Sequence, residues 1–282
     1  GITCMESGKY EDAVKAFQNA LGESIGHIGE KELDICFYKA KAQALDGKTK
    51  DALATYNAII KYNKDARAYY LRGDLYMDMG EEKKGRADFE SAVQQGKKNY
   101  EIYIGIYESL SRHEKKDEGQ KYLSAAMEIK GDKPEDELYK GRISYLLGEN
   151  KDAISYLEKA KEHKQMLASY YLGLAYDANG DSDKAKKCIA EYIKSGVATS
   201  YDLYELGMQE MQDGNYKNAL TYFNSGLELE KVPNKQNLMK SAIAAYEYSG
   251  DFDSAKKMMK EYLKAYPDDE EAKHENTFLE TR

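Results

Sequence analysis

The chain has 282 residues, a formal net charge of −8 and a pI near 5.3, and this acidic balance argues against a nucleic-acid partner because phosphate binding needs a stripe of lysine and arginine. No stretch approaches the roughly 18 consecutive apolar residues of a membrane span, so we expect no transmembrane segment. Only 3 prolines, together with abundant Ala, Lys, Glu and Leu, favour an all-α protein.

A short pattern recurs about every 34 residues: a turn glycine, a small residue five positions later and a large apolar residue nine positions later. Its first copy is Gly8, Ala13 and Phe17. Six further copies carry the glycine, at Gly47, Gly80, Gly148, Gly180, Gly214 and Gly250. Glycine ends a helix in the left-handed conformation without a Cβ penalty, so each copy predicts two helices joined by a tight turn.

An eighth, degenerate copy lies midway between Gly80 and Gly148, where Glu114 stands in the place of the turn glycine and is followed by Gly119 and Leu123 at the same offsets. Small residues also recur seven positions before most turn glycines, which predicts a close helix crossing in each hairpin. A lone hairpin cannot bury its apolar face, so about eight copies must stack into a solenoid.

The order of these elements predicts a single solenoid over residues 1–282, with repeats 1–4 in residues 1–133 and repeats 5–8 in residues 134–267. The first repeat is truncated, so we expect an upstream segment that can hold a secretion signal or lipid anchor. A lengthened link at residues 22–31 and another ending near Pro134 are candidate flex points. Residues 268–282 predict a polar capping helix, with Phe278 and Leu279 available to pack back on the array.

The repeats resemble the tetratricopeptide repeat family, and the strongest copies are residues 8–21, 171–185, 206–227 and 250–267. The resemblance covers nearly the whole chain, although the closing proline of the family pattern survives clearly only as Pro267. It implies a right-handed α-α superhelix whose concave face is lined by the first helix of each repeat. It also implies a protein or peptide partner.

No catalytic, metal or cofactor motif stands out, so we expect a protein that is not an enzyme and has neither a cofactor nor a metal centre. The cysteines Cys4, Cys36 and Cys188 have no metal-ligand spacing and are expected as small buried hydrophobic residues. The four histidines, expected to be solvated, lie among charged or linker residues outside any HExxH motif: His27, His113, His163 and His274.

The position ten residues before each turn resembles the family's groove-facing site, and it is mostly aromatic or aliphatic along this chain. We therefore predict a peptide-binding groove that is richest in the sixth and seventh repeats. Its predicted residues are Phe37, Tyr70, Tyr170, Leu174, Tyr201, Tyr204, Met208 and Met211. In the alternative interpretation the register is off by one residue, and these side chains belong to the core between repeats.

Acidic neighbours of the groove favour a partner with basic character: Asp34, Asp74, Asp177 and Glu247. The leading hypothesis is a non-enzymatic scaffold that binds a peptide segment of another protein in this groove. One alternative is a structural subunit of a self-associating or envelope-located assembly, and another is the sensor part of a longer protein with its effector upstream. Bacterial members of the family show a similar arrangement, so both a cytoplasmic and an extracytoplasmic, lipid-anchored location stay open.

Overall fold

A computed structural model describes residues 1–24, 28–131 and 133–282, and every regular element in these residues is an α-helix. Two compact units divide the chain after Lys194, and each is described by itself. Unit 1 contains α1 (Ile2–Glu6), α2 (Tyr10–Glu23), α3 (Glu30–Leu45), α4 (Thr49–Asn63), α5 (Ala66–Asp78), α6 (Glu82–Gln95), α7 (Tyr100–Arg112), α8 (Lys116–Met127), α9 (Pro134–Leu147), α10 (Asn150–Glu162), α11 (Ala168–Ala178) and α12 (Ser182–Lys194). Unit 2 contains α13 (Ser200–Gln212), α14 (Tyr216–Leu227), α15 (Lys235–Tyr248), α16 (Phe252–Ala265) and α17 (Glu270–Glu280).

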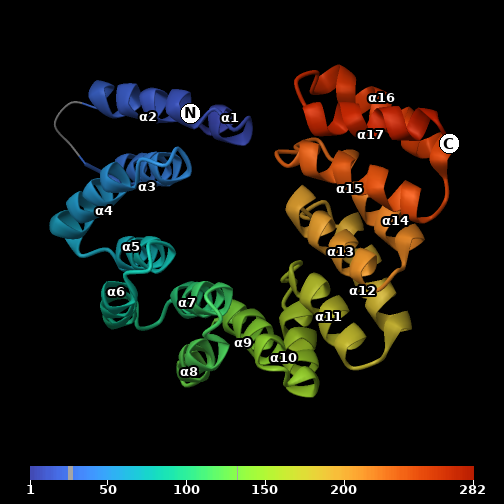
Figure 1. Ribbon diagram of the computed structural model, residues 1–282. Helices are drawn as coiled ribbons and strands as arrows, with labels where there is room; N and C mark the ends of the chain where they lie inside the picture. Colours follow the sequence, from blue (N-terminus) through green and yellow to red (C-terminus); the bar gives the residue numbers. More distant parts are fainter. Residues whose placement is uncertain (25–27, 132) are drawn as a thin grey trace. The chain divides into compact units, whose positions relative to one another are not determined.

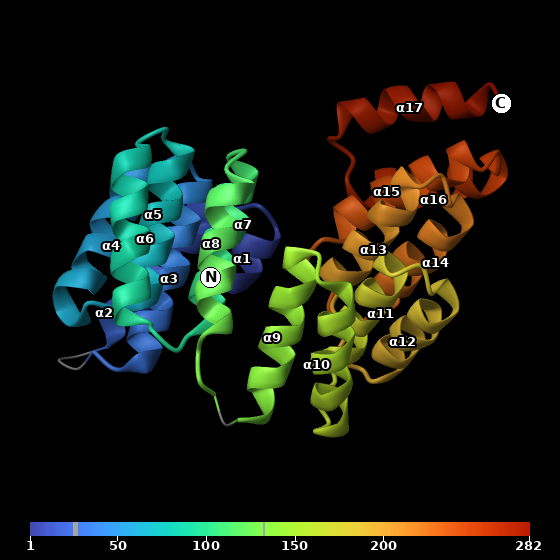
Figure 2. The same cartoon turned by 90° about the horizontal axis from the view of Figure 1, so that it is seen from below.

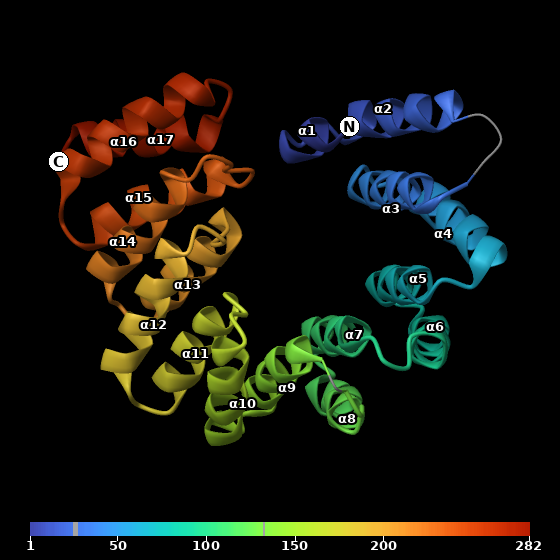
Figure 3. The same ribbon diagram turned by 180° about the vertical axis from the view of Figure 1, so that it is seen from behind.

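The helices follow one another as hairpins, from α1–α2 to α15–α16, and this confirms the all-α solenoid of helical hairpins and is compatible with eight repeats. In unit 1 the first helices α3, α5 and α7 line the inner side of the array, while α4, α6 and α8 lie on the outer side (Figures 1 and 3). The predicted division into halves at residues 133 and 134 stays a prediction. The predicted link at residues 22–31 includes residues 25–27, which lie outside the described residues.

The turn inside each hairpin has the conformation that the repeated glycine predicts. The seven turn glycines, Gly8, Gly47, Gly80, Gly148, Gly180, Gly214 and Gly250, have φ between 68° and 84°. Glu114 has φ 61°, and the turn that it forms has the hydrogen bonds of the glycine turns: Lys115 N–H donates to Leu110 O at 2.8 Å, as Lys48 N–H donates to Gln43 O at 2.8 Å. The degenerate copy is therefore a true turn, in which glutamate adopts a left-handed conformation that strains its Cβ.

Glycine is required at the helix crossings of the α11–α12 and α13–α14 hairpins because a large side chain of the second helix occupies the space of a Cβ. An added Cβ at Gly207 would lie 2.3 Å from Phe223 Cε1, and one at Gly173 would lie 2.4 Å from Ile189 Cδ1. The large residue follows the glycine by sixteen positions in both hairpins. In the degenerate repeat the small and the large residue of the crossing exchange helices. The glycine, Gly119, is on the second helix and lies against the backbone of Tyr107 on the first.

Unit 2 ends in the predicted capping helix. Figure 2 shows α17 at one side of the α15–α16 hairpin, and α17 packs chiefly on α16. Leu279 is fully buried in a cluster with Met259 and Tyr262, as predicted. Phe278 does not pack back into the core but stays 43% exposed.

Two of the three cysteines are less buried than predicted. Cys188 is buried, whereas Cys4 and Cys36 are half-buried, and all three are free thiols. Cys36 borders a cavity of about 400 Å³ between α3 and α4, and Cys4 lies at the edge of a small cluster around Phe17, so neither is enclosed on all sides. None of the helices in the described part of the chain combines the length and apolar character that a membrane crossing requires.

Candidate functional site

Phe37 and Tyr70 lie on the first helices of unit 1, and neighbouring side chains cover much of both. Phe37 is buried beside Tyr56, and the Arg67 guanidinium carbon lies 3.6 Å from the centre of its ring. Tyr70 is half-buried, with its ring 6.3 Å from the Phe89 ring and against the backbone of Gly105 on α7. Burial, followed by the negative charge of Asp74, raises the pKa of Tyr70, so its ring is a neutral packing group.

Tyr170 and Leu174 lie one turn apart on α11, also in unit 1, and both are half-buried. The Tyr170 ring lies 5.1 Å from the Tyr171 ring and 5.2 Å from the fully buried Tyr192 ring. These contacts hold the Tyr170 ring against side chains of α11 and α12, the two helices of its own hairpin.

The four remaining predicted residues form one stripe along α13 in unit 2. Tyr201, Tyr204, Met208 and Met211 follow the spacing of a single helix face, three or four residues apart. Tyr201 is 55% exposed, and the other three are half-buried against the cluster of Phe223 and Leu238. The structure thus brings these four together on one accessible face, which we call the α13 stripe.

The α13 stripe continues onto the neighbouring first helix, α15. Ser241 Oγ on α15 lies 3.6 Å from Met208 Sδ and donates a weak hydrogen bond to it. At the far end of α15, Tyr248 is 68% exposed and stacks on Tyr216, with 5.3 Å between ring centres. A protein surface with Tyr and Met in this arrangement offers rigid aromatic anchors beside adaptable thioethers.

An ion-pair ladder on the first helices of unit 1 was not predicted. Each rung joins an acidic residue to an arginine about one repeat later. The three rungs are Asp34 to Arg67 at 2.7 Å, Asp74 to Arg112 at 2.6 Å and Glu108 to Arg142 at 2.8 Å. The feature of the sequence that could have indicated this ladder is an arginine 33 to 38 residues after an acidic residue.

The ladder changes the electrostatics expected of the groove. Asp34 and Asp74, two of the acidic neighbours predicted to attract a basic partner, are already paired with arginine. Asp177 is exposed, and its carboxylate accepts a hydrogen bond from Ser182 Oγ at 3.4 Å. Of the four, Glu247 is the one that is both enclosed and without a cation within ion-pair distance in the described residues.

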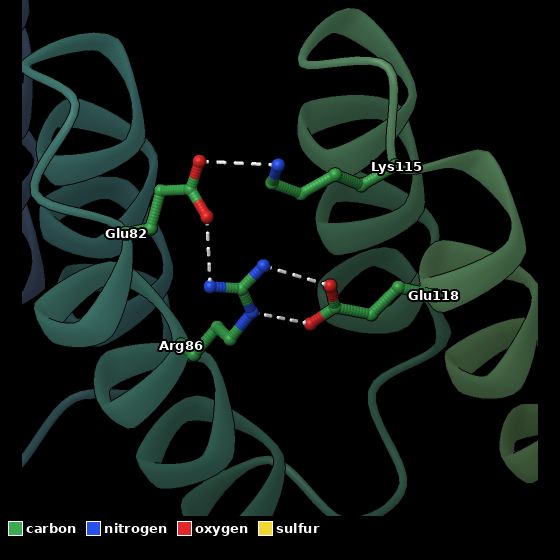
Figure 4. Close-up of polar contacts among 4 residues, drawn as sticks. All are labelled: Glu82, Arg86, Lys115 and Glu118. Atoms are coloured by element: carbon green, nitrogen blue, oxygen red, sulfur yellow. Dashed lines mark hydrogen bonds and ion pairs between the residues drawn. The ribbon is translucent and has the colours of Figure 1, made fainter.

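The second helices of unit 1 carry a separate network, shown in Figure 4. Arg86 on α6 binds Glu118 on α8 through Nε at 2.7 Å and Nη2 at 3.0 Å, and it also binds Glu82 at 2.9 Å. Lys115 completes the network with an ion pair to Glu82 at 3.1 Å. Since all four residues lie on or beside second helices, this network joins two repeats away from the groove face.

Three side chains that offer metal-ligand atoms come together at the ends of α5 and α7: Asp74, Asp78 and His113 lie with these atoms within 4.8 Å of one another. His113 Nε2 is 3.1 Å from Asp78 Oδ1, so this half-buried histidine has a carboxylate partner rather than the solvent predicted for it. The Arg112 guanidinium also lies against both carboxylates, at 2.6 Å and 3.8 Å. Because Arg112 already pairs with both carboxylates, the cluster is better explained as part of the ladder. His163 and His274 are exposed as predicted, and His27 lies outside the described residues.

Two family models described as tetratricopeptide repeat match the sequence. One matches residues 3–61 and 39–100, and the other matches residues 167–195 and 236–269. The matched residues together span more than half of the chain. No curated protein sequence matches the chain.

Several solved structures are similar in fold. A tetratricopeptide repeat protein from Parabacteroides merdae is 12% identical, with a TM-score of 0.51 over 86% of this chain and 94% of that one. PilW, a widely conserved type IV pilus biogenesis factor, is 18% identical, with a TM-score of 0.48 over 74% of this chain and 97% of that one. The APC/C hetero-tetramer Cut9-Hcn1 includes a chain that is 17% identical, with a TM-score of 0.48 over 90% of this chain and 51% of that one.

Proposed function

Because this chain belongs to the tetratricopeptide repeat family, whose proteins generally mediate protein–protein interactions, we propose that it is a non-enzymatic scaffold that binds a segment of a partner polypeptide. The proposed binding surface is the first-helix face of unit 2, formed by the α13 stripe and the adjoining face of α15. Proteins of this family are generally non-enzymatic, which agrees with a scaffold.

The α13 stripe is the observation that carries this proposal. Its residues keep the spacing of one helix face, yet none of the four is fully buried, and Tyr201 is more than half exposed. A contiguous accessible row of Tyr and Met on one helix face needs an explanation, whereas single exposed apolar side chains elsewhere in the chain do not. Binding of an apolar segment of a partner would remove this surface from water and supply the free energy of association.

The test is selection of binding peptides from a displayed random library, followed by calorimetric titration of the selected peptides. We expect the α13 double variant Tyr201→Ala with Met208→Ala to weaken binding at least tenfold, which corresponds to about 1.4 kcal/mol. Tyr62→Ala is the matched control, because Tyr62 is also a tyrosine that is 55% exposed on a helix but lies on the second helix α4. This control is expected to bind the peptides as the wild type does.

The location of the bound peptide can be checked by hydrogen exchange. Protection on peptide binding should fall on α13 and α15 and spare the second helices. Equal affinity for the wild type and the double variant, or protection confined to second helices, would contradict the proposed surface.

A further inference from the structure

A cavity of about 570 Å³ lies in unit 2 between α15, α16 and α17. It exists because α17 packs chiefly on α16, through residues such as Leu279, while the Phe278 side of the helix is left without cover. The apolar part of its wall comes from Ile243, Ala244, Tyr248, Phe252, Met259 and Phe278. Ala244 and Tyr248 belong to α15, so the cavity lies beside the surface proposed for the partner.

The cavity also holds carboxylates that lack a counter-ion. Glu247 on α15 and Glu275 on α17 line it, and no lysine, arginine or histidine lies within ion-pair distance of either in the described residues. Glu247 Oε1 is inaccessible to water and has no hydrogen-bond partner among those residues. An unsatisfied enclosed acceptor of this kind costs free energy until a donor reaches it.

The lysine that lines the cavity, Lys240, is already engaged in ion pairs. Lys240 Nζ lies 2.9 Å from Asp269 Oδ2 and 3.3 Å from Glu271 Oε2, at the start of α17. The two other titratable groups of the wall are the Tyr248 and Tyr262 hydroxyls, and Tyr262 Oη lies against Asp269 Oδ2. Burial, followed by the charge of Glu275 and by a side-chain hydrogen bond between the two carboxyls, raises the pKa of Glu247 to about 7.

Two aromatic rings of the cavity wall contact a cation that belongs to the chain itself. The Arg282 guanidinium carbon lies 4.6 Å from the centre of the Phe278 ring and 5.9 Å from the centre of the Phe252 ring. Both rings line the cavity. These ring faces therefore accept a cation, and a basic side chain of a partner would lie beside Arg282 or displace it.

We infer that the cavity between α15 and α17 receives a basic side chain, lysine or arginine, of the bound partner polypeptide. The inference rests on the proposed function, because it assigns a subsite of the same surface. The alkyl stem of such a side chain would lie along Ile243, Met259 and the aromatic rings, and its charged head would donate to Glu247 and Glu275. An apolar side chain would fill the same space but leave the enclosed Glu247 oxygen without a donor.

The probes for this subsite are the acetylated and amidated single amino acids lysine, arginine and norleucine, titrated against the whole chain by NMR at pH 7. The lysine and arginine derivatives should shift the amide signals of α15 and α17, and the uncharged norleucine derivative should bind at least tenfold more weakly. The substitution Glu247→Gln should weaken the binding of the lysine derivative at least tenfold. Glu261→Gln, an exposed position on α16 outside the cavity, is the control and should leave the binding unchanged.

Equal shifts from the norleucine and lysine derivatives, the absence of shifts from all three, or an unchanged affinity of the Glu247→Gln variant would overturn the inference. These outcomes are separable from the failure of the proposed function. Suppose that library peptides bind the α13 stripe without a basic residue and bind the Glu247→Gln variant as tightly as the wild type. This result would contradict the basic-side-chain subsite but would agree with the proposed scaffold function.

Discussion

At the scale of single residues, Glu247 is a carboxyl in an unusual environment. It lies beside Glu275 in a largely apolar cavity, and burial followed by that negative charge raises its pKa from an ordinary 4.5 to about 7. The folded chain thus holds this proton more tightly than the unfolded chain does. The resulting stabilisation is complete below pH 4.5 and is lost as the pH rises through 7.

This protonation predicts that the wild type and the Glu247→Gln variant differ in their free energy of unfolding, and that the difference depends on pH. The two should have similar stability near pH 4.5, whereas at pH 8 the variant should be more stable by about 1 kcal/mol, a value reduced for the part of the carboxyl that water screens. Urea unfolding followed by circular dichroism at both pH values measures the difference. A variant that is less stable than the wild type at pH 8 would show that the carboxylate is stabilising and that the assigned environment is wrong.

Individual residues also show how far the sequence predicts the fold. The offset pattern placed the eighth turn at Glu114, and the left-handed φ of that residue confirms it, because the pattern is set by helix geometry and survives the loss of one glycine. The half-burial of Cys36 was not predictable, because it depends on a cavity between α3 and α4 that only side-chain packing determines.

At the scale of the element, the α13–α14 hairpin depends on a glycine opposite a large side chain. A Cβ at Gly207 would approach Phe223 to 2.3 Å, while one at Gly22, near the end of α2, would have no atom within 4 Å. Gly207→Ala should therefore lower the free energy of unfolding by about 1 to 3 kcal/mol through overpacking. Gly22→Ala should raise it by up to about 1 kcal/mol, because alanine favours the helix.

Chemical denaturation of the two variants beside the wild type makes this comparison. The pair is matched, since both changes add one methyl group to a helical glycine. A Gly207→Ala variant as stable as Gly22→Ala would mean that α13 and α14 do not cross at this glycine.

The candidate site was partly predictable at this scale. The α13 stripe follows from helical periodicity, so Tyr201, Tyr204, Met208 and Met211 could be placed on one face from their spacing alone. The ion-pair ladder requires two residues about 34 positions apart to meet, and the cavity in unit 2 depends on how α17 docks. Both are tertiary features that no local pattern specifies.

At the scale of the whole molecule, the chain is built from neighbouring contacts, and the ladder in unit 1 shows this most clearly. Asp34 and Arg67 join one pair of repeats, and Glu108 and Arg142 join another, with no residue in common. Both acids are exposed, so Asp34→Ala and Glu108→Ala should each lower the free energy of unfolding by less than about 1 kcal/mol.

Their combination should be additive within about 0.5 kcal/mol, because the two rungs share no partner. Equilibrium unfolding of the two single variants and the double variant measures the coupling. A coupling above about 1 kcal/mol would mean that stability in unit 1 is not a sum over adjacent repeats.

The contacts within both units have a further consequence for how the chain reaches its native state. The principal contacts of each helix are with the next helix along the chain or the next but one, as in α5 with α6 and α7. The mean sequence separation of contacting residues is therefore low, and such topologies fold quickly because few long loops must close before contacts form. A hairpin can form soon after it leaves the ribosome and then serve as the surface on which the following hairpin condenses.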